Sequence, residues 1–470
     1  MNCSCCFICT GALLLASACP AKTNEVWVKV DAAKIVRTVD ARLFGVNTAI
    51  WDSHFDSTDT VLALRELDVQ TLRFQGGSLS DAYHWASHTT IGNSRTWPTS
   101  FSNFVHVATN IQAQVFITVN YGSGTPEEAA AWVRCANVTN NFGFKYWEVG
   151  NENFGNWEYD VNSPPHDPLT YATRTRDYFR QMKAADPAIK IGVVVVTEGY
   201  GDWTPKMLKK LKQLGVTPDF VIYHVYPEYA GGEDDARLLQ SAAQWTADAG
   251  KLRRQLEKCL GGANTNVELL CTENNSVSEK MGKQTTSLVN GLYLADSFGE
   301  IVQTEFGSFL WWDLRNVQEP NHNNGPALYG WRQYGDHGIM TCNGTRYPTF
   351  YTLKLLKYFA RGGDRMVRAT SNNKLLSVYG ARRANGTMSL LVINKSPNAT
   401  LTVNFSIAGF KPDSGAVMYS YGIPQDEAAR TGIGSPDIAQ TNFTGTGAKF
   451  PCNFLPYSAT VNTLSPCRAK

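Results

Sequence analysis

Two glutamates in this chain follow strongly apolar runs, where a charge is costly unless function requires it. Glu152 comes two residues after the run 144–150 (FKYWEVG), and Glu273 closes the run 266–273 (NVELLCTE). Cleavage of a glycosidic bond needs two such carboxyl groups, one to protonate the departing oxygen and one to attack or stabilise the sugar carbon. Taken singly, either glutamate is explained by a helix cap or a salt bridge. Taken together, the pair predicts a glycosidase.

The segments that must position these glutamates alternate short apolar runs with amphipathic helical stretches. That alternation is typical of repeated βα units, and runs that are apolar on both faces indicate parallel strands covered by helices. Eight strand candidates are present, at 43–47, 70–74, 114–120, 144–150, 189–196, 219–226, 266–273 and 308–314. Eight strands within about 270 residues predict a (β/α)₈ TIM barrel.

In such a barrel the active site lies at the carboxyl ends of the strands. Read in order, those ends carry these candidates for substrate binding: Asn47, Arg73, Asn120, Asn151, His224, Tyr226 and Trp312. Asn151 has a specific task available, a hydrogen bond to the sugar 2-hydroxyl that strengthens in the transition state. Trp312 offers an aromatic face for a sugar ring, although packing explains most buried tryptophans. Glu152 and Glu273 should face each other across the mouth.

The sequence pattern changes after about residue 360. From there on, apolar and polar residues alternate in segments separated by Gly, Asn and Pro turns. This pattern predicts a β-sandwich. Residues 25–40 alternate in the same way and should add a strand to it. We therefore expect an α/β fold class, with a catalytic barrel at 41–358 and a C-terminal β-sandwich at 359–470 that includes the N-terminal strand.

The composition fits a folded protein and narrows the function. The 470 residues have a formal charge of +2, with 43% hydrophobic and 18% charged residues. This balance argues against disorder and against nucleic-acid binding, which normally requires a strong basic excess. No apolar run beyond the leader approaches ~20 residues, so no membrane span is expected. The cysteines after the leader have no CxxC spacing, and the sequence has no HExxH, GxGxxG or P-loop spacing, so we expect no metal and no cofactor.

The N-terminal residues 1–19 (MNCSCCFICTGALLLASAC) combine an apolar stretch with a small-residue pattern, Ala16-Ser17-Ala18. This combination predicts a signal peptide and export, with a lipid-anchored start at Cys19 as the alternative. Six cysteines follow the leader, and an even number in an exported chain suggests disulfides. The first candidates are the pairs nearest in sequence, which are Cys259 with Cys271 and Cys452 with Cys467.

The segment KYWEVGNENFGNWE (145–158) resembles the acid/base strand of clan A glycoside hydrolases. Within that clan, TLRFQGGSLSDAYHW (71–85) and VNYGSGTPEEAAAWVRCAN (119–137) resemble the second-strand and third-strand segments of family 51, the α-L-arabinofuranosidases. The resemblance implies an enzyme that retains configuration, with Glu152 as acid/base and Glu273 as nucleophile.

The same resemblance implies that Asn151, Arg73, His224 and Tyr226 line the subsite of the cleaved sugar, and that Tyr226 or His224 orients Glu273. A retaining mechanism requires the two carboxyl groups to lie about 5–5.5 Å apart. We therefore expect an exported retaining hydrolase that releases α-L-arabinofuranosyl units from plant cell-wall polysaccharide.

Two departures from family 51 leave other substrates open. The segment around Glu273 reads LLCTENNSV instead of an acidic–Glu–Trp pattern, and NENFGNW after the acid/base lacks the family's usual Met. The first alternative is an endo- or exo-acting β-glycosidase of the same clan, a β-glucanase or a β-xylosidase. The second is a non-catalytic carbohydrate-binding barrel. The sequence leaves the oligomeric state open.

Overall fold

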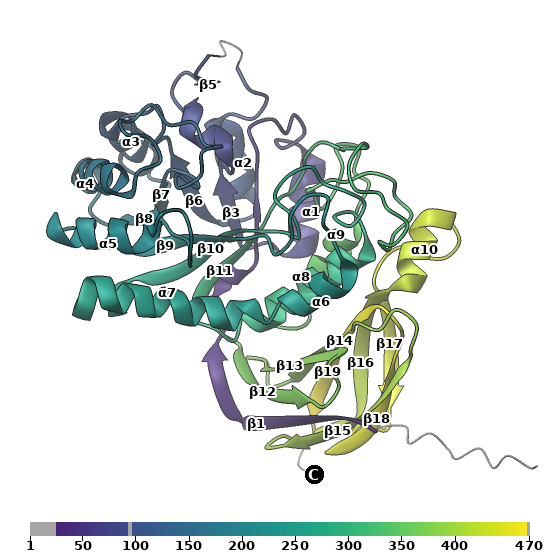
Figure 1. Cartoon of the computed structure of the whole chain (residues 1–470). Coiled ribbons are helices and arrows are strands. Elements are labelled where there is room, and N and C mark those ends of the chain that lie inside the picture. Colours follow the sequence, from purple (N-terminus) through teal and green to yellow (C-terminus); the bar gives the residue numbers. More distant parts are fainter. Residues whose placement is uncertain (1–24, 93–95, 468–470) are drawn as a thin grey trace, which may run out of the picture.

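The computed structural model describes residues 25–92 and 96–467. It has two parts, a barrel of parallel strands ringed by helices and a strand-rich part that lies below the barrel in Figure 1. The predicted signal peptide at 1–19 and the alternative anchor at Cys19 lie outside the described residues. Within the described ranges, no helix has the length and apolar character needed to cross a membrane.

Eight parallel strands close the barrel in the order β10-β11-β2-β3-β6-β7-β8-β9. Their bounds are β2 (Gly45–Asn47), β3 (Thr71–Phe74), β6 (Gln114–Val119), β7 (Tyr146–Val149), β8 (Lys190–Val194), β9 (Phe220–Val225), β10 (Glu268–Asn274) and β11 (Phe306–Trp311). Each strand falls within or beside one of the eight predicted runs. The predicted fold class is therefore confirmed.

Helices connect the strands and cover the outside of the barrel (Figure 1). They are α1 (Thr58–Leu67), α2 (Phe101–Asn110), α3 (Pro126–Val133), α4 (Pro168–Ala185), α5 (Trp203–Gln213), α6 (Asp235–Ser241), α7 (Gln244–Leu260), α8 (Leu288–Ile301) and α9 (Pro348–Leu356). The first turns of α3 and α4 are capped by the side chains that precede them. The Thr125 side chain accepts a hydrogen bond from the Glu128 amide ahead of α3, and Asp167 accepts two at the start of α4.

Short elements complete this part of the chain. They are the turns of helix η1 (Ala41–Leu43), η2 (Ser78–Ala82), η3 (Arg134–Thr139) and η4 (Gly261–Asn266), and the two-stranded ribbon β4 (Tyr83–His84) with β5 (Thr89–Thr90). The loops that follow β3, β6 and β7 bring η2 and residues near 151–158 to the mouth of the barrel, where the candidate site lies.

The strand-rich part is one nine-stranded sheet in the order β17-β16-β19-β14-β13-β12-β1-β15-β18. Its strands are β1 (Val26–Thr38), β12 (Arg365–Ser371), β13 (Leu376–Arg382), β14 (Met388–Asn394), β15 (Leu401–Ala408), β16 (Pro412–Gly422), β17 (Ala439–Thr444), β18 (Lys449–Phe454) and β19 (Ser458–Pro466), with α10 (Ile423–Thr431) after β16. The N-terminal strand β1 pairs antiparallel with β12 and parallel with β15.

This sheet folds over to enclose its own core, which makes it the predicted β-sandwich. Strands β17 and β18 stand at opposite ends of the hydrogen-bonded order, yet the rings of Phe443 and Phe450 lie 6.1 Å apart. Phe405 of β15 stacks on Phe450 at 4.9 Å. The enclosed side chains form an apolar cluster separate from the barrel core.

The other face of the sheet packs on the barrel through α8 and α9. Leu391 and Val461 belong to the same buried apolar cluster as the residues of the barrel. Tyr379 of β13 donates a 2.7 Å hydrogen bond to Asp296 of α8, and Lys395 forms a 3.1 Å ion pair with the same carboxylate. The barrel and the outer face of the sheet therefore share one core, which is distinct from the cluster enclosed by the sheet.

Neither predicted disulfide is present. The Cys259 thiol lies on α7 and contacts the Pro205 carbonyl, whereas the Cys271 thiol lies within strand β10 and contacts the Glu273 carbonyl. Both are free, as is Cys452 in the core of the sheet. The prediction relied on closeness in sequence. Cys259 and Cys271 are twelve positions apart, but the chain passes from a helix to a strand between them, so the two thiols lie in different layers.

Candidate active site

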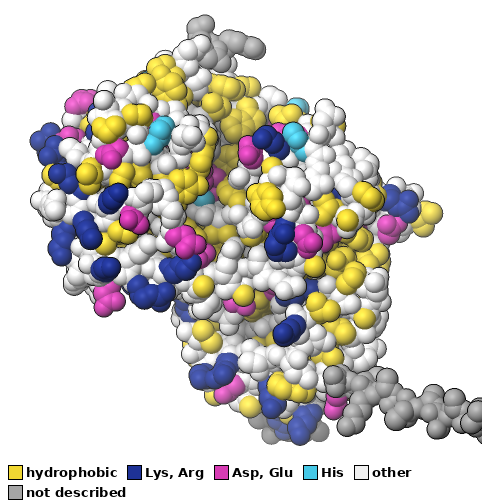
Figure 2. Space-filling view, viewed as in Figure 1, with side chains coloured by type: hydrophobic (Ala, Val, Ile, Leu, Met, Phe, Trp, Pro, Cys, Tyr) yellow, Lys and Arg dark blue, Asp and Glu magenta, His cyan; other side chains and the backbone are white. Residues whose placement is uncertain are grey.

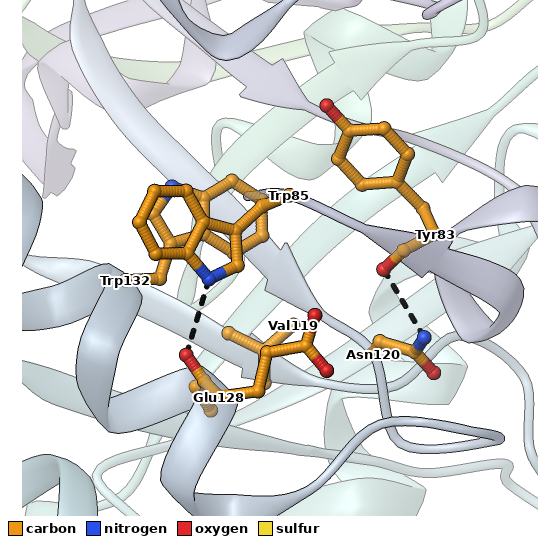
Figure 3. Close-up of a pocket in the computed structure, with 7 residues that line it drawn as sticks. Tyr83, Trp85, Val119, Asn120, Glu128 and Trp132 are labelled. Carbon is orange, nitrogen blue, oxygen red and sulfur yellow. Dashed lines mark hydrogen bonds between the residues drawn. The ribbon is translucent and has the colours of Figure 1, made fainter. Parts of the chain in front are cut away.

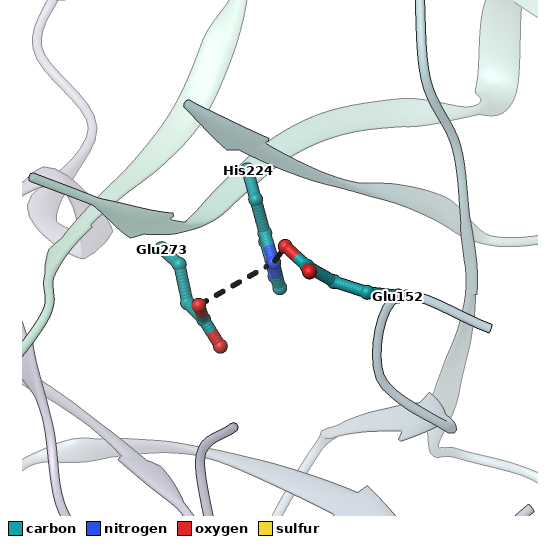
Figure 4. A group of neighbouring side chains, drawn as sticks. All are labelled: Glu152, His224 and Glu273. Carbon is teal, nitrogen blue, oxygen red and sulfur yellow. Dashed lines mark hydrogen bonds and ion pairs between the residues drawn. The ribbon is translucent and has the colours of Figure 1, made fainter. Parts of the chain in front are cut away.

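The two predicted carboxyl groups meet at the carboxyl end of the barrel strands (Figure 4). Glu152 lies just after β7 in a left-handed backbone conformation (φ 41°), preceded by Gly150 at φ 73°. Such a conformation is costly for a residue other than glycine and is found mostly where function requires it. Glu273 points inward from β10. Its side chain is 5% exposed, compared with 18% for Glu152.

His224 of β9 lies between the two glutamates. Its Nδ1 is 2.8 Å from Glu152 Oε1 and 3.5 Å from Glu273 Oε2, while its Nε2 is 3.1 Å from Thr272 Oγ1. One oxygen of Glu152 and one of Glu273 lie within 4.8 Å of each other. The three donor atoms are close enough together to hold a metal ion, and also close enough to act on one bond of a substrate.

Glu273 is held as a charged group. Arg73 Nη1 donates to its Oε1 at 2.6 Å, and the Tyr226 hydroxyl donates to its Oε2 at 2.8 Å. Burial by itself would raise the pKa of Glu273, but His224, Arg73 and Tyr226 outweigh burial and hold that pKa below its ordinary value. An oriented carboxylate that stays ionised is suited to attack an electrophilic carbon.

Arg73 links four strands at the base of the site. The guanidinium is fully buried and donates to Glu148, Glu273, Asn47 and Asn151, at distances from 2.6 to 3.1 Å. These partners come from β7, β10, β2 and the loop after β7. The fixed fork of Arg73 therefore sets the position of Glu273 relative to the segment that carries Glu152.

Asn47 and Asn151 are both occupied within this network. Asn47 Nδ2 donates to the Thr272 carbonyl at 2.8 Å. Asn151 Nδ2 donates to Glu158 Oε1 at 2.9 Å, and its Oδ1 accepts from Arg73. Asn47 is wholly buried, whereas Asn151 directly precedes Glu152.

Sequence reasoning missed three acidic residues of this network, Glu148, Asp81 and Glu158. Glu148 is wholly buried in β7 and accepts from Arg73 and Thr118. Asp81 in η2 accepts from the amides of residues 121, 122 and 151 and from the Asn153 side chain. The available signal was a charge inside an apolar strand at Glu148, four residues before Glu152.

Two of these acids have raised pKa values. Burial raises the pKa of Asp81 even though the carboxylate accepts four hydrogen bonds. Burial, followed by the neighbouring charges of Asp81 and Glu152, raises the pKa of Glu158 well above its usual range. Glu158 Oε2 has no hydrogen-bond partner among the described residues. Two buried acids therefore lie beside the loop of Glu152, opposite the ionised Glu273.

Trp312 forms one wall of the site. It is 7% exposed, and its ring meets that of Trp51 edge-on at 6.2 Å. Gly76 and Gly77 lie against the same ring, so closely that a Cβ on either would come within 2.6 Å of it. These two glycines allow the β3 loop to approach the tryptophan. Figure 2 shows the barrel half hollowed near its middle, with hydrophobic side chains along the hollow.

Asn120 does not join the cluster, contrary to the prediction. Its Nδ2 donates to the Tyr83 carbonyl at 3.1 Å, as Figure 3 shows, and its Oδ1 accepts from the amides of Ser123 and Gly124. The chain turns sharply after β6, and the Asn120 side chain closes that turn. The nearby hollow in Figure 3 leaves no room for a ligand, because Trp85 stacks on Trp132 at 5.7 Å and fills it.

Comparison with known proteins finds relatives named α-L-arabinofuranosidase that match part of this chain. No family model matches the chain. A probable α-L-arabinofuranosidase C of Aspergillus fumigatus is 23% identical over 201 residues, which are 37% of this chain and 39% of that protein. An intracellular exo-α-L-arabinofuranosidase of Bacteroides ovatus is 30% identical over 128 residues, 21% of this chain and 24% of that protein. The match thus spans about two fifths of the first relative's length and about a quarter of the second's.

Solved structures share the fold over nearly the whole chain. An α-L-arabinofuranosidase of Thermotoga maritima in complex with arabinose has a TM-score of 0.74 at 19% identity, covering 93% of this chain and 99% of its own. A family 51 α-L-arabinofuranosidase of Bifidobacterium longum has a TM-score of 0.72 at 15% identity, covering 94% and 99%. A family 44 xyloglucanase of Paenibacillus polymyxa has a TM-score of 0.68 at 13% identity, covering 94% and 99%.

These likenesses confirm the resemblance to clan A glycoside hydrolases and to family 51 that the sequence motifs indicated. At such low identities the structures show a shared fold.

Proposed function

We propose that the protein is a retaining glycoside hydrolase that releases α-L-arabinofuranosyl units from plant cell-wall polysaccharide. The observation that carries the proposal is the pair of Glu152 and Glu273, whose oxygens lie within 4.8 Å across the mouth of the barrel. A pair this close supports retention of configuration, because inversion needs a wider gap of about 6.5–9.5 Å to admit a water. The relatives named α-L-arabinofuranosidase favour that sugar.

The reaction would take two steps. Glu273 attacks the anomeric carbon while Glu152 gives its proton to the departing oxygen, so that a glycosyl-enzyme forms and the rest of the substrate leaves as an alcohol. Glu152, now a carboxylate, takes a proton from water, and the water oxygen displaces Glu273 to release the sugar. Arg73 and Tyr226 hold Glu273 in the charged state that the first step needs.

Kinetics of two variants test these roles. Glu273→Ala should abolish turnover of every substrate, because it removes the nucleophile. Glu152→Ala should lower kcat/KM for an oligosaccharide by about 10²–10⁴-fold. It should lower kcat/KM for a 4-nitrophenyl glycoside much less, since nitrophenolate leaves without a proton, whereas kcat should fall for both substrates because Glu152 is also the base of the second step. Equal losses of kcat/KM on both substrates would overturn the assignment of Glu152. NMR of the first-formed sugar tests retention directly, and an α anomer is expected.

The substrate is tested by a panel of aryl glycosides. Hydrolysis of the arabinofuranoside in preference to the xyloside and glucoside is expected. A β-glycosidase of the same clan is the second candidate, since the family 44 xyloglucanase shares this fold over 94% of the chain. Activity that survives EDTA would show that the Glu152, His224 and Glu273 group works without a metal ion.

Export is part of the proposal and rests on the leader at residues 1–19. When the full chain is expressed, the expected result is that the protein appears in the medium without residues 1–19. Retention of the full chain inside the cell would contradict it.

A further inference from the structure

The connection between β11 and α9, called here the β11 loop, starts at the wall of the site and then folds back on itself. It covers residues 312–347 and begins with Trp312. The Asp313 amide donates to the His337 carbonyl at 3.1 Å, and the Ile339 amide donates to the Asp313 carbonyl at 3.0 Å. The position of Trp312 therefore depends on the returning half of the β11 loop.

The returning half of the β11 loop is joined to the sandwich by a buried ion pair. Arg332 Nη1 lies 3.1 Å from Asp426 Oδ1 of α10, and Trp331 Nε1 donates to the same oxygen at 3.3 Å. Asp426 is wholly buried, and Arg332 is 4% exposed. Figure 1 shows α10 rising from the sheet beside the loops of the barrel. Because a buried charge is costly without its partner, this ion pair fixes the loop to the sandwich.

A continuous set of contacts runs from Arg332 toward the start of the β11 loop. The guanidinium lies over the rings of Trp331 and Tyr347, at 4.0 and 5.6 Å from their centroids. The Tyr347 hydroxyl donates to Asp336 Oδ2 at 3.0 Å, and the Asp336 amide donates to the Thr285 hydroxyl at 3.0 Å. Arg332 therefore helps to place Asp336, the neighbour of the residue that pairs with the start of the loop.

The last contacts of this set reach Trp312 itself. Asn275, which follows β10, donates through Nδ2 to the carbonyls of both Trp312 and His337. His337 Nε2 lies 2.8 Å from the Val277 carbonyl. Asn275, His337 and Trp312 are all buried. In a close-packed interior, a displacement at one end of such a network is passed on to the other end.

We propose that Asp426 is a positioning residue for Trp312, so that the sandwich helps to hold the wall of the sugar site. Asp426 acts through Arg332 and touches no substrate. Because it assumes a sugar ring against Trp312, this inference rests on the proposed function. An aromatic wall contributes to binding of the ring and takes no part in bond cleavage, so a displaced wall should affect KM more than kcat.

Kinetics of Asp426→Ala, Trp312→Ala and the double variant test this coupling. Asp426→Ala should raise KM for 4-nitrophenyl α-L-arabinofuranoside by about 3–10-fold and change kcat by less than about twofold. In the Trp312→Ala background the same change should alter kcat/KM by less than about twofold, because the side chain through which Asp426 acts is gone. An unchanged KM for Asp426→Ala, or an equal loss in both backgrounds, would overturn the inference and leave the hydrolase intact.

Lys395→Met is the matched control. Lys395, directly after β14, forms another buried ion pair between the sheet and the barrel, with Asp296 of α8 at 3.1 Å. Breaking it should lower the midpoint of unfolding, as Asp426→Ala does, and leave KM within about twofold of the parent. A KM raised equally by both variants would overturn the positioning role. If the Asp426→Ala protein does not fold, Asp426→Asn takes its place in the same cycle, since it keeps an acceptor oxygen for Trp331 and weakens the pair with Arg332.

Hydrogen exchange followed by mass spectrometry tests the coupling without any substrate. Peptides that cover residues 312–316 and 331–339 should exchange faster in Asp426→Ala than in the parent, and at the parental rate in Lys395→Met. Parental exchange in Asp426→Ala would overturn the inference whatever substrate the enzyme cleaves. Faster exchange in a protein that cleaves no arabinofuranoside would support the coupling and count against the proposed function alone.

Discussion

Arg73 forms ion pairs with two carboxylates of the site. Its buried guanidinium is the partner of two buried carboxylates, Glu148 at 2.7 Å and Glu273 at 2.6 Å. Breaking a buried pair leaves an uncompensated charge in a medium of low polarity. The stability of the barrel and the ionised state of Glu273 therefore depend on the same side chain.

We expect Arg73→Met to lower the free energy of unfolding by about 3–5 kcal/mol and to abolish activity. Urea denaturation followed by fluorescence measures the first effect. Arg180→Met is the control. That arginine is 75% exposed and forms only a long ion pair of 3.7 Å with Asp177, so its loss should change stability little. A loss of activity without loss of stability would contradict the structural half of the prediction.

Glu158 provides a prediction for pH. Its folded-state pKa lies above the ordinary 4.5, chiefly because it is buried. A raised folded pKa means that stability is fully present below the unfolded pKa and is lost as pH rises through the folded pKa. Glutamine mimics the neutral acid and can accept from both Ser78 and Asn151. Glu158→Gln should therefore keep activity near neutral pH and reduce the fall in unfolding free energy from pH 4.5 upward.

Thermal unfolding of Glu158→Gln and of the parent across this pH range measures the difference. Parallel pH profiles for the two proteins would show that Glu158 is already ionised in the folded state.

At the residue scale the sequence was sufficient to predict that two glutamates meet at the mouth of the barrel, and insufficient for the residues that support them. Glu152 and Glu273 could be predicted because each stands at or just after the end of an apolar run. Asp81 and Glu158 lie in loops whose local sequence resembles any polar turn, and only the meeting of three loops makes them buried. Asn120 was wrongly expected to join the cluster. The end of a strand fixes the backbone position of the next residue, whereas the following turn decides where its side chain points.

At the scale of elements, the close approach of the β3 loop to Trp312 is the most sensitive junction of the site. A Cβ on Gly76 would lie 2.5 Å from the Trp312 ring and 2.8 Å from Asn47 Oδ1, and both neighbours are buried. We expect Gly76→Ala to cost about 1–3 kcal/mol through overpacking and to lower kcat/KM.

The control for this variant is Gly262→Ala, where a Cβ meets nothing within 4 Å. Calorimetry and kinetics should show little change for Gly262→Ala. An unchanged kcat/KM for Gly76→Ala would mean that the Trp312 wall yields without affecting the substrate.

The elements themselves were the most predictable level of the structure. Eight apolar runs bounded by turn residues became eight strands because parallel strands are buried on both faces, and that burial is visible in the sequence. The strand contributed by residues 26–38 was also visible from its alternation. The disulfides were not, because covalent pairing depends on distances in space that spacing along the chain does not set.

At the scale of the whole molecule, the core shared by the barrel and the sheet governs unfolding. Leu390 faces the interior of the sheet, and its neighbour Leu391 belongs to the core shared with the barrel. We expect calorimetry to show a single transition, and Leu390→Ala and Leu391→Ala each to lower its midpoint, at a cost of about 2–5 kcal/mol. Two separate peaks, with only one moved by Leu390→Ala, would show that the parts unfold independently.

The position of β1 has a consequence for how the chain is made. A ribosome releases residues 26–38 more than 300 residues before the β12 and β15 segments that flank them in the finished sheet. Throughout that interval the barrel can assemble, while a strand with one apolar face and unpaired backbone groups has no partner in the sheet. The nascent chain therefore exposes an unpaired, aggregation-prone strand during most of its synthesis. Its yield in a cell should depend on chaperones that shield this strand.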